Sequence, residues 1–74
     1  MKRSVLVIDD EPPVLKFSAR ILSRSFDPVV AVTSAEAGLA LIDSGAFFDV
    51  ILCDYCLPGM SGRELFMHLR KKHP

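Results

Sequence analysis

Three aspartates of this 74-residue chain stand at the ends of short apolar runs. Asp9 and Asp10 follow the run VLVI, and Asp54 follows the run VILC. If both runs are strands of one parallel sheet, their carboxyl ends meet at the same edge, where ligands bind in such sheets. Clustered carboxylates repel one another, and a hard divalent cation such as Mg²⁺ relieves that repulsion. A site of this kind can hold a phosphoryl group, and a carboxylate can itself be the nucleophile that accepts it. The three acids therefore predict a magnesium-dependent phosphoryl site.

Two cysteines flank the third acid, in the order Cys53-Asp54-Tyr55-Cys56. The C-x-x-C spacing is typical of zinc and redox sites. A structural zinc ion requires four ligands, and the two histidines, His68 and His73, lie near the far end of the chain. We interpret Cys53 as a small buried hydrophobic residue of a strand, with a metal or redox function of the pair as the alternative.

Three strands and three helices are expected to alternate along the chain. Short apolar runs predict strands over residues 5–8, 29–32 and 48–53, and the first of these is the continuous run typical of a strand buried on both faces. The first helix begins at the prolines Pro12 and Pro13, which belong in a first turn, and Asp27-Pro28 is expected to end the helical pattern. Its predicted buried face consists of Val14, Phe17, Ile21 and Leu22.

The second and third helices have recognisable start signals. Thr33 and Glu36 form a T-x-x-E capping box, and Ser61 and Glu64 form a second box of the same kind. The second helix presents Ala35, Leu39 and Ile42 on one stripe and is expected to stop near Ser44-Gly45. The third is expected to run to about Lys72. Alternation of this kind indicates an α/β domain with a parallel sheet and right-handed crossovers.

The composition of the chain limits the classes of function and the cellular settings that we expect for it. Lys plus Arg and Asp plus Glu are balanced at nine each, so charge does not favour direct binding of nucleic acid or an anionic membrane. No apolar run approaches the length of a membrane span, and the apolar part of the N-terminal segment is too short for a signal peptide. Two cysteines three positions apart cannot crosslink a small secreted fold, so we expect a reduced, cytoplasmic setting.

The segments VLVIDDEPPVL and VILCDYCLPGMSGRELF resemble the receiver domain of two-component response regulators. The resemblance extends from about Ser4 to His73, and it implies that residues 1–74 form a partial receiver with the first three of the family's five βα units. The implied fold is flavodoxin-like, with three α/β/α layers and the strands in the order 2-1-3.

The resemblance also implies a role for each matching residue. Asp54 matches the phosphoacceptor, which takes its phosphoryl group from a sensor histidine kinase or a phosphotransfer protein. The implied Mg²⁺ ligands are Asp10 directly, Asp9 mainly through water, Asp54, and the backbone carbonyl of Cys56. Pro58 and Gly62 match the residues that shape the following loop and begin the next helix. A receiver of this kind is a substrate of its kinase, so we expect no conventional enzyme activity.

Two residues of the family's site have no counterpart here. The family's fourth strand ends in a Ser or Thr and its fifth in a Lys, and Lys71 and Lys72 lie at the wrong end of the third helix to replace that Lys. The third strand is also expected to form an open apolar edge, which native proteins avoid. We therefore expect either self-association or a domain swap through this strand, or that the chain is a piece of a larger receiver. The alternative function is a truncated receiver that acts as an assembly element without phosphotransfer.

Overall fold

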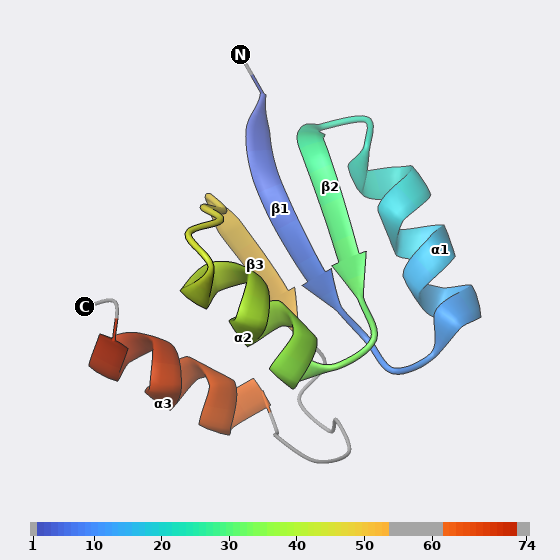
Figure 1. Ribbon diagram of the computed structural model, residues 1–74. Coiled ribbons are helices and arrows are strands. Elements are labelled where there is room, and N and C mark those ends of the chain that lie inside the picture. The colour runs from blue at the N-terminus through green and yellow to red at the C-terminus, as the bar shows by residue number, and fades with distance from the viewer. Residues whose placement is uncertain (1, 54–61, 73–74) are drawn as a thin grey trace.

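The structure is a computed structural model that describes residues 2–53 and 62–72, in which strands and helices alternate (Figure 1). In chain order the elements are β1 (Arg3–Ile8), α1 (Pro12–Leu22), β2 (Phe26–Val32), α2 (Ala35–Asp43), β3 (Val50–Cys53) and α3 (Gly62–Lys72). The strands form one parallel sheet in the order β2-β1-β3. The predicted α/β class and the order 2-1-3 are confirmed.

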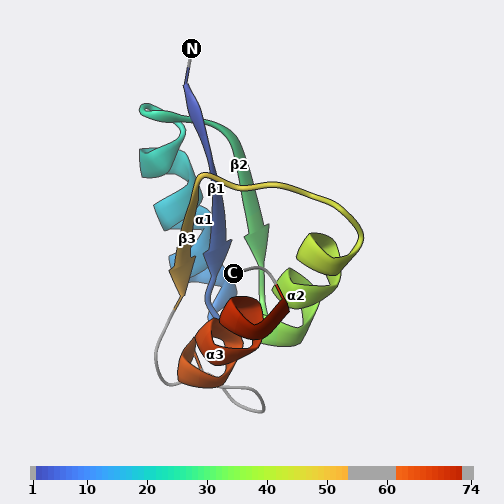
Figure 2. The same cartoon turned by 90° about the vertical axis from the view of Figure 1, so that its left-hand side faces the viewer.

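Helices cover both faces of this sheet, so the chain has the three predicted α/β/α layers (Figure 2). Side chains alternate along β1, the central strand. Leu6 and Ile8 pack against α2 and α3, while Val5 and Val7 pack against α1. All four are at most 5% exposed, which agrees with the prediction that this strand is buried on both faces.

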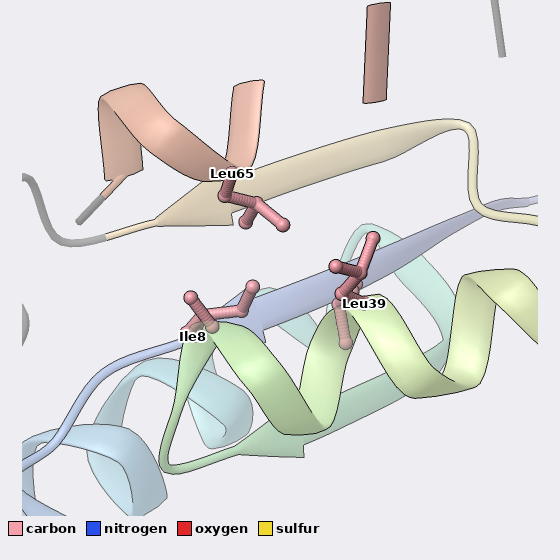
Figure 3. Close-up of a cluster of buried hydrophobic side chains, with 5 residues drawn as sticks. Ile8, Leu39 and Leu65 are labelled. Carbon is pink, nitrogen blue, oxygen red and sulfur yellow. The ribbon is translucent and has the colours of Figure 1, made fainter. Parts of the chain in front are cut away.

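The larger core cluster lies between the sheet and helices α2 and α3. Its buried members are Leu6, Ile8, Ala35, Leu39 and Leu65, and Leu65 of α3 points toward Ile8 and Leu39 (Figure 3). Gly38 lets α2 approach β1 closely, because a Cβ atom at this position would lie 2.7 Å from the Cδ1 atom of Ile8. The two helices therefore hold the end of β1 that leads into Asp9.

The predicted end of the first helix is wrong. Helix α1 stops at Leu22, where Ser23 caps it by donating its backbone N–H to the Ala19 carbonyl, and β2 already begins at Phe26. Asp27 and Pro28 thus lie inside a strand. Proline is tolerated there because β2 is an edge strand and its register with β1 shifts at this point.

The predicted buried face of α1 is also wrong for three of its four residues. Val14 is 42% exposed, Phe17 65% and Ile21 45%, whereas Leu22 is half-buried and the buried residue is Leu15. Leu15 and Leu22 lie seven positions apart and share the face that contacts the sheet. We refer to Val14, Phe17 and Ile21 as the outer stripe of α1.

Smaller differences concern where elements start. The N-cap of α2 is Ser34, whose hydroxyl accepts a hydrogen bond from the Ala37 N–H at 3.1 Å, so the predicted Thr33–Glu36 box is wrong by one residue. Strand β3 begins at Val50 and not at Phe48. The end of α2 is as predicted, with Ser44 as its C-cap and Gly45 in the left-handed region at φ +107°. Among the described helices, none has the length and hydropathy that a membrane span requires.

Candidate functional site

The strands that precede the predicted site residues lie side by side and in register. Both β1 and β3 run in the same direction, and Ile8 is the partner of Cys53 in the ladder. Asp9 follows Ile8 in the sequence, and Asp54 follows Cys53. Asp54, Cys56 and Pro58 themselves lie outside the described residues, so their predicted roles stay predictions.

Asp9 is half-buried and is held by two hydrogen bonds. Its backbone N–H donates to the carbonyl of Val32 at 3.2 Å, which ties the end of β1 to the end of β2. Its carboxylate oxygen Oδ1 accepts the backbone N–H of Glu11 at 2.9 Å. A side-chain bond to the backbone two residues on closes a local turn. The orientation of this carboxylate is therefore fixed by the chain that surrounds it.

Asp10 and Glu11 lie between this turn and helix α1, and both are exposed. Glu11 is the N-cap residue of α1, but its side chain makes no capping bond. Its backbone carbonyl accepts the N–H of Leu15 at 2.9 Å. The partial positive charge at a helix N-terminus favours nearby anions. The acids of this segment thus precede a helix end that stabilises negative charge.

A cavity of about 400 Å³ opens beside Asp9, between α1 and β3. Its lining is apolar apart from Asp9 and Ser18, and includes Phe17, Ile21 and Leu52. Leu52 is 43% exposed. The residues that complete the lining are Val7, Ile8, Leu22 and Cys53. The face of the sheet next to the acids is therefore only partly covered in the part of the chain that the structure describes.

The described residues hold two of the four predicted magnesium ligands, Asp9 and Asp10. Within residues 2–53 and 62–72, no group of three or more acidic, histidine or cysteine side chains gathers at a distance suited to a metal. Cys53 is half-buried and packs against the Leu6–Ile8 side of the core, as a small hydrophobic residue would. Helix α3 begins at Gly62, whose predicted loop-shaping role stays a prediction.

One pair of residues at the opposite ends of these two strands has no counterpart in the sequence analysis. Ser4 near the start of β1 and Asp49 just before β3 exchange hydrogen bonds although they are 45 positions apart. An acid before an apolar run was visible in the sequence. Its partner was not, because no local spacing connects the two residues.

Comparison with known proteins identifies the family. The model of the response regulator receiver domain matches residues 5–74. The virulence sensor protein BvgS of Bordetella pertussis is 42% identical over 66 residues, which are 89% of this chain and 5% of that protein. The two-component response regulator ORR8 of Oryza sativa subsp. indica is 37% identical over 67 residues, or 90% of this chain and 55% of the relative.

A third relative, the transcriptional regulatory protein TcrA of Mycobacterium tuberculosis, is 32% identical over 68 residues, which cover 92% of this chain and 26% of TcrA. The chain thus spans at most 55% of the length of these relatives. Three observations are consistent with a receiver domain: the matched segment, the parallel sheet in the order β2-β1-β3, and the acid that follows β1. The chain belongs to the response regulator receiver domain family of two-component systems.

Proposed function

We propose that this chain is a phosphoacceptor module that receives a phosphoryl group on Asp54 from a histidine kinase or a phosphotransfer protein. A carboxylate oxygen of Asp54 forms the new bond to phosphorus, the bond between phosphorus and the donor histidine nitrogen breaks, and that nitrogen keeps the electron pair. The chain is the substrate of this transfer and not a conventional enzyme. We place the reaction in the cytoplasm.

The observation that carries this proposal is the register of β1 and β3 in a chain of the receiver family. Ile8 and Cys53 are ladder partners, and each is followed in sequence by an acid of the predicted site. Parallel strands present their carboxyl ends at one edge, which is where ligands bind in open α/β sheets.

The donor atoms of this segment suit Mg²⁺, which prefers oxygen ligands and keeps several waters. Asp9, Asp10, Asp54 and the backbone carbonyl of Cys56 would hold the ion. Bound there, Mg²⁺ neutralises negative charge on the phosphoryl oxygens. One oxygen of Asp9 already accepts the Glu11 N–H, so the second oxygen is better suited to a water-mediated contact. The exposed Asp10 can approach a metal directly.

The test is labelling of the purified chain by acetyl phosphate and by a cognate kinase, with and without Mg²⁺. We expect labelling that requires Mg²⁺ and disappears in Asp54→Ala. The matched control is Asp27→Ala, which removes an exposed acid from the far edge of the sheet and should leave labelling unchanged. Labelling that persists in Asp54→Ala would contradict the proposal.

A second candidate function is an assembly element without phosphotransfer, and the two edges of the sheet favour it. The β2 edge carries Asp27, Pro28 and a register shift, all of which discourage pairing with another strand. The β3 edge has the sequence VILC, without charge or proline. Two β3 strands could pair antiparallel around a two-fold axis, or an element could be exchanged between copies.

Sedimentation at micromolar concentration tests this second candidate. We expect a dimer that dissociates in Leu52→Lys, because a lysine on an edge strand opposes pairing. The control is Met67→Lys, which places the same charge at a 60% exposed position on α3. A monomer with cooperative unfolding at every concentration would contradict self-association. A conformational response to beryllofluoride with Mg²⁺ would favour the phosphoacceptor over the assembly element.

A further inference from the structure

We propose that Ser4 and Asp49 form a clamp that positions the phosphoacceptor by fixing the register of β3 against β1, an inference that rests on the function proposed above. The Ser4 N–H donates to Oδ2 of Asp49 at 2.8 Å. In return, the Asp49 N–H donates to the hydroxyl oxygen of Ser4 at 3.0 Å. The Ser4 hydroxyl then donates either to Oδ2 of Asp49 at 3.2 Å or to the carbonyl of Phe47 at 3.5 Å.

Strand β3 needs such a clamp because its own sequence specifies its register weakly. It has four residues, and β1 is its one neighbour among the described strands. A shift by one residue exchanges the two faces of a strand, and a polar residue forced into a core normally prevents it. The four residues of β3 are Val, Ile, Leu and Cys, so its own side chains leave either face apolar after a shift, and the residues that distinguish the registers are those that flank the strand, such as Asp49. Hydrophobic burial alone therefore discriminates poorly between neighbouring registers.

The clamp lies at a position from which it can select the register of β3 against β1. Val5 pairs with Val50 in the ladder, so Ser4 and Asp49 are the next positions of the same register. The Asp49 carboxylate supplies the acceptor for the Ser4 N–H at the point where β3 begins. A shifted β3 would separate both donors from their acceptors. The native register is thus the one in which these bonds form.

The clamp lies at the start of β3, and the proposed phosphoacceptor is the residue that follows this short strand in the sequence. A shift of one residue moves the chain by about 3.3 Å along the strand direction. A misplacement of about 1 Å can reduce a reaction rate by roughly 100-fold. The residue that follows Cys53 therefore depends on the register that Ser4 and Asp49 select, although neither touches the phosphoryl group.

The experiment compares Asp49→Ala and Ser4→Ala with the conservative variants Asp49→Asn and Ser4→Thr, which keep an acceptor oxygen and a hydroxyl. The control is Ser23→Ala, because the Ser23 hydroxyl donates to the Arg20 carbonyl at 2.7 Å at the exposed end of α1, which leads into β2 on the opposite side of β1 from β3. Two readouts are taken at a temperature where every variant is fully folded by circular dichroism. One is the rate of labelling by acetyl phosphate, and the other is amide hydrogen exchange at residues 50–53.

We expect Asp49→Ala to label about ten-fold more slowly or worse and to exchange its β3 amides faster. Ser4→Ala should have a smaller effect, since its backbone N–H still reaches Asp49. The conservative variants should recover most of the wild-type rate. If the role of Ser4 were purely structural, Ser4→Ala and Ser23→Ala would both lower the melting temperature, and neither would change the labelling rate.

Wild-type exchange and labelling in Asp49→Ala would overturn the clamp, as would an equal loss of labelling in Ser23→Ala. If the wild-type chain takes no label at all, the proposed function fails and the positioning role fails with it. In that case the exchange rates at residues 50–53 still decide whether Ser4 and Asp49 hold β3 in place.

Discussion

The two faces of the sheet differ in how fully they are covered. On one face, helices α2 and α3 bury five residues in a single cluster. On the other face, α1 is the one helix among the described elements, and the cluster beneath it has three buried residues. Phe17 and Ile21 of the outer stripe and Leu52 of β3 line the cavity beside Asp9, and all three are exposed. Burial removes apolar surface from water and is the main stabilising contribution, so stability should be concentrated on the α2–α3 face.

The largest expected effect is on the covered face, at Leu65. This side chain is 2% exposed and connects α3 to β1 and α2. We expect Leu65→Ala to lower the free energy of unfolding by about 2–5 kcal/mol, since truncation leaves a cavity. The measurement is urea denaturation followed by circular dichroism. The neighbouring Phe66 is 60% exposed, and the Arg70 guanidinium carbon lies 5.9 Å from the centroid of its ring, so Phe66→Ala should lower stability by no more than about 1 kcal/mol. Equal losses in the two variants would mean that α3 does not pack as described.

An intermediate effect is expected at the start of α2, which fixes that helix on the covered face. Ser34→Ala should cost about 1 kcal/mol, because the Ala37 N–H loses its side-chain acceptor. Thr33→Ala, at the cap position predicted from sequence, should cost much less. Thermal unfolding of both variants gives the comparison, and a larger loss in Thr33→Ala would restore the original assignment of the cap.

The smallest effect is expected on the open face, at Phe17. A buried phenylalanine truncated to alanine costs about 3–5 kcal/mol, but Phe17 is 65% exposed. Phe17→Ala should therefore lower stability by no more than about 1 kcal/mol in dilute solution. The loss is measured by urea denaturation at several protein concentrations. A large, concentration-dependent loss would show that a second chain covers the outer stripe, which would favour the assembly function.

Sequence patterns predicted the element order, the sheet and the burial of β1, because alternation of strands and helices constrains topology strongly. They placed the boundaries of elements wrongly where the same residues suit two different local structures. Phe26 suits the helical period of α1 as well as the start of β2, and Thr33 and Ser34 are adjacent residues that can both cap a helix. The outer stripe of α1 has helical spacing, but spacing cannot tell which face of the helix meets the sheet.

Only the part of the site that has a local sequence pattern could be predicted. Asp9 and Asp10 stand out because acids directly follow an apolar strand. The Ser4–Asp49 pair was hidden because its partners are 45 positions apart and neither residue belongs to a recognisable motif. Contacts of that kind depend on which strands become neighbours, which only the folded topology decides.

Because the Asp9 carboxylate accepts a hydrogen bond from the Glu11 N–H, this side chain has two roles that substitutions can separate. As an acceptor it shapes the turn into α1, and as an anion it contributes charge to the proposed metal site. An asparagine at this position would keep the hydrogen-bond acceptor and lose the negative charge, whereas an alanine would lose both. The charge at residue 9 can therefore be removed without removing the acceptor that shapes the turn, which makes this residue the natural starting point for testing the proposed metal site by substitution.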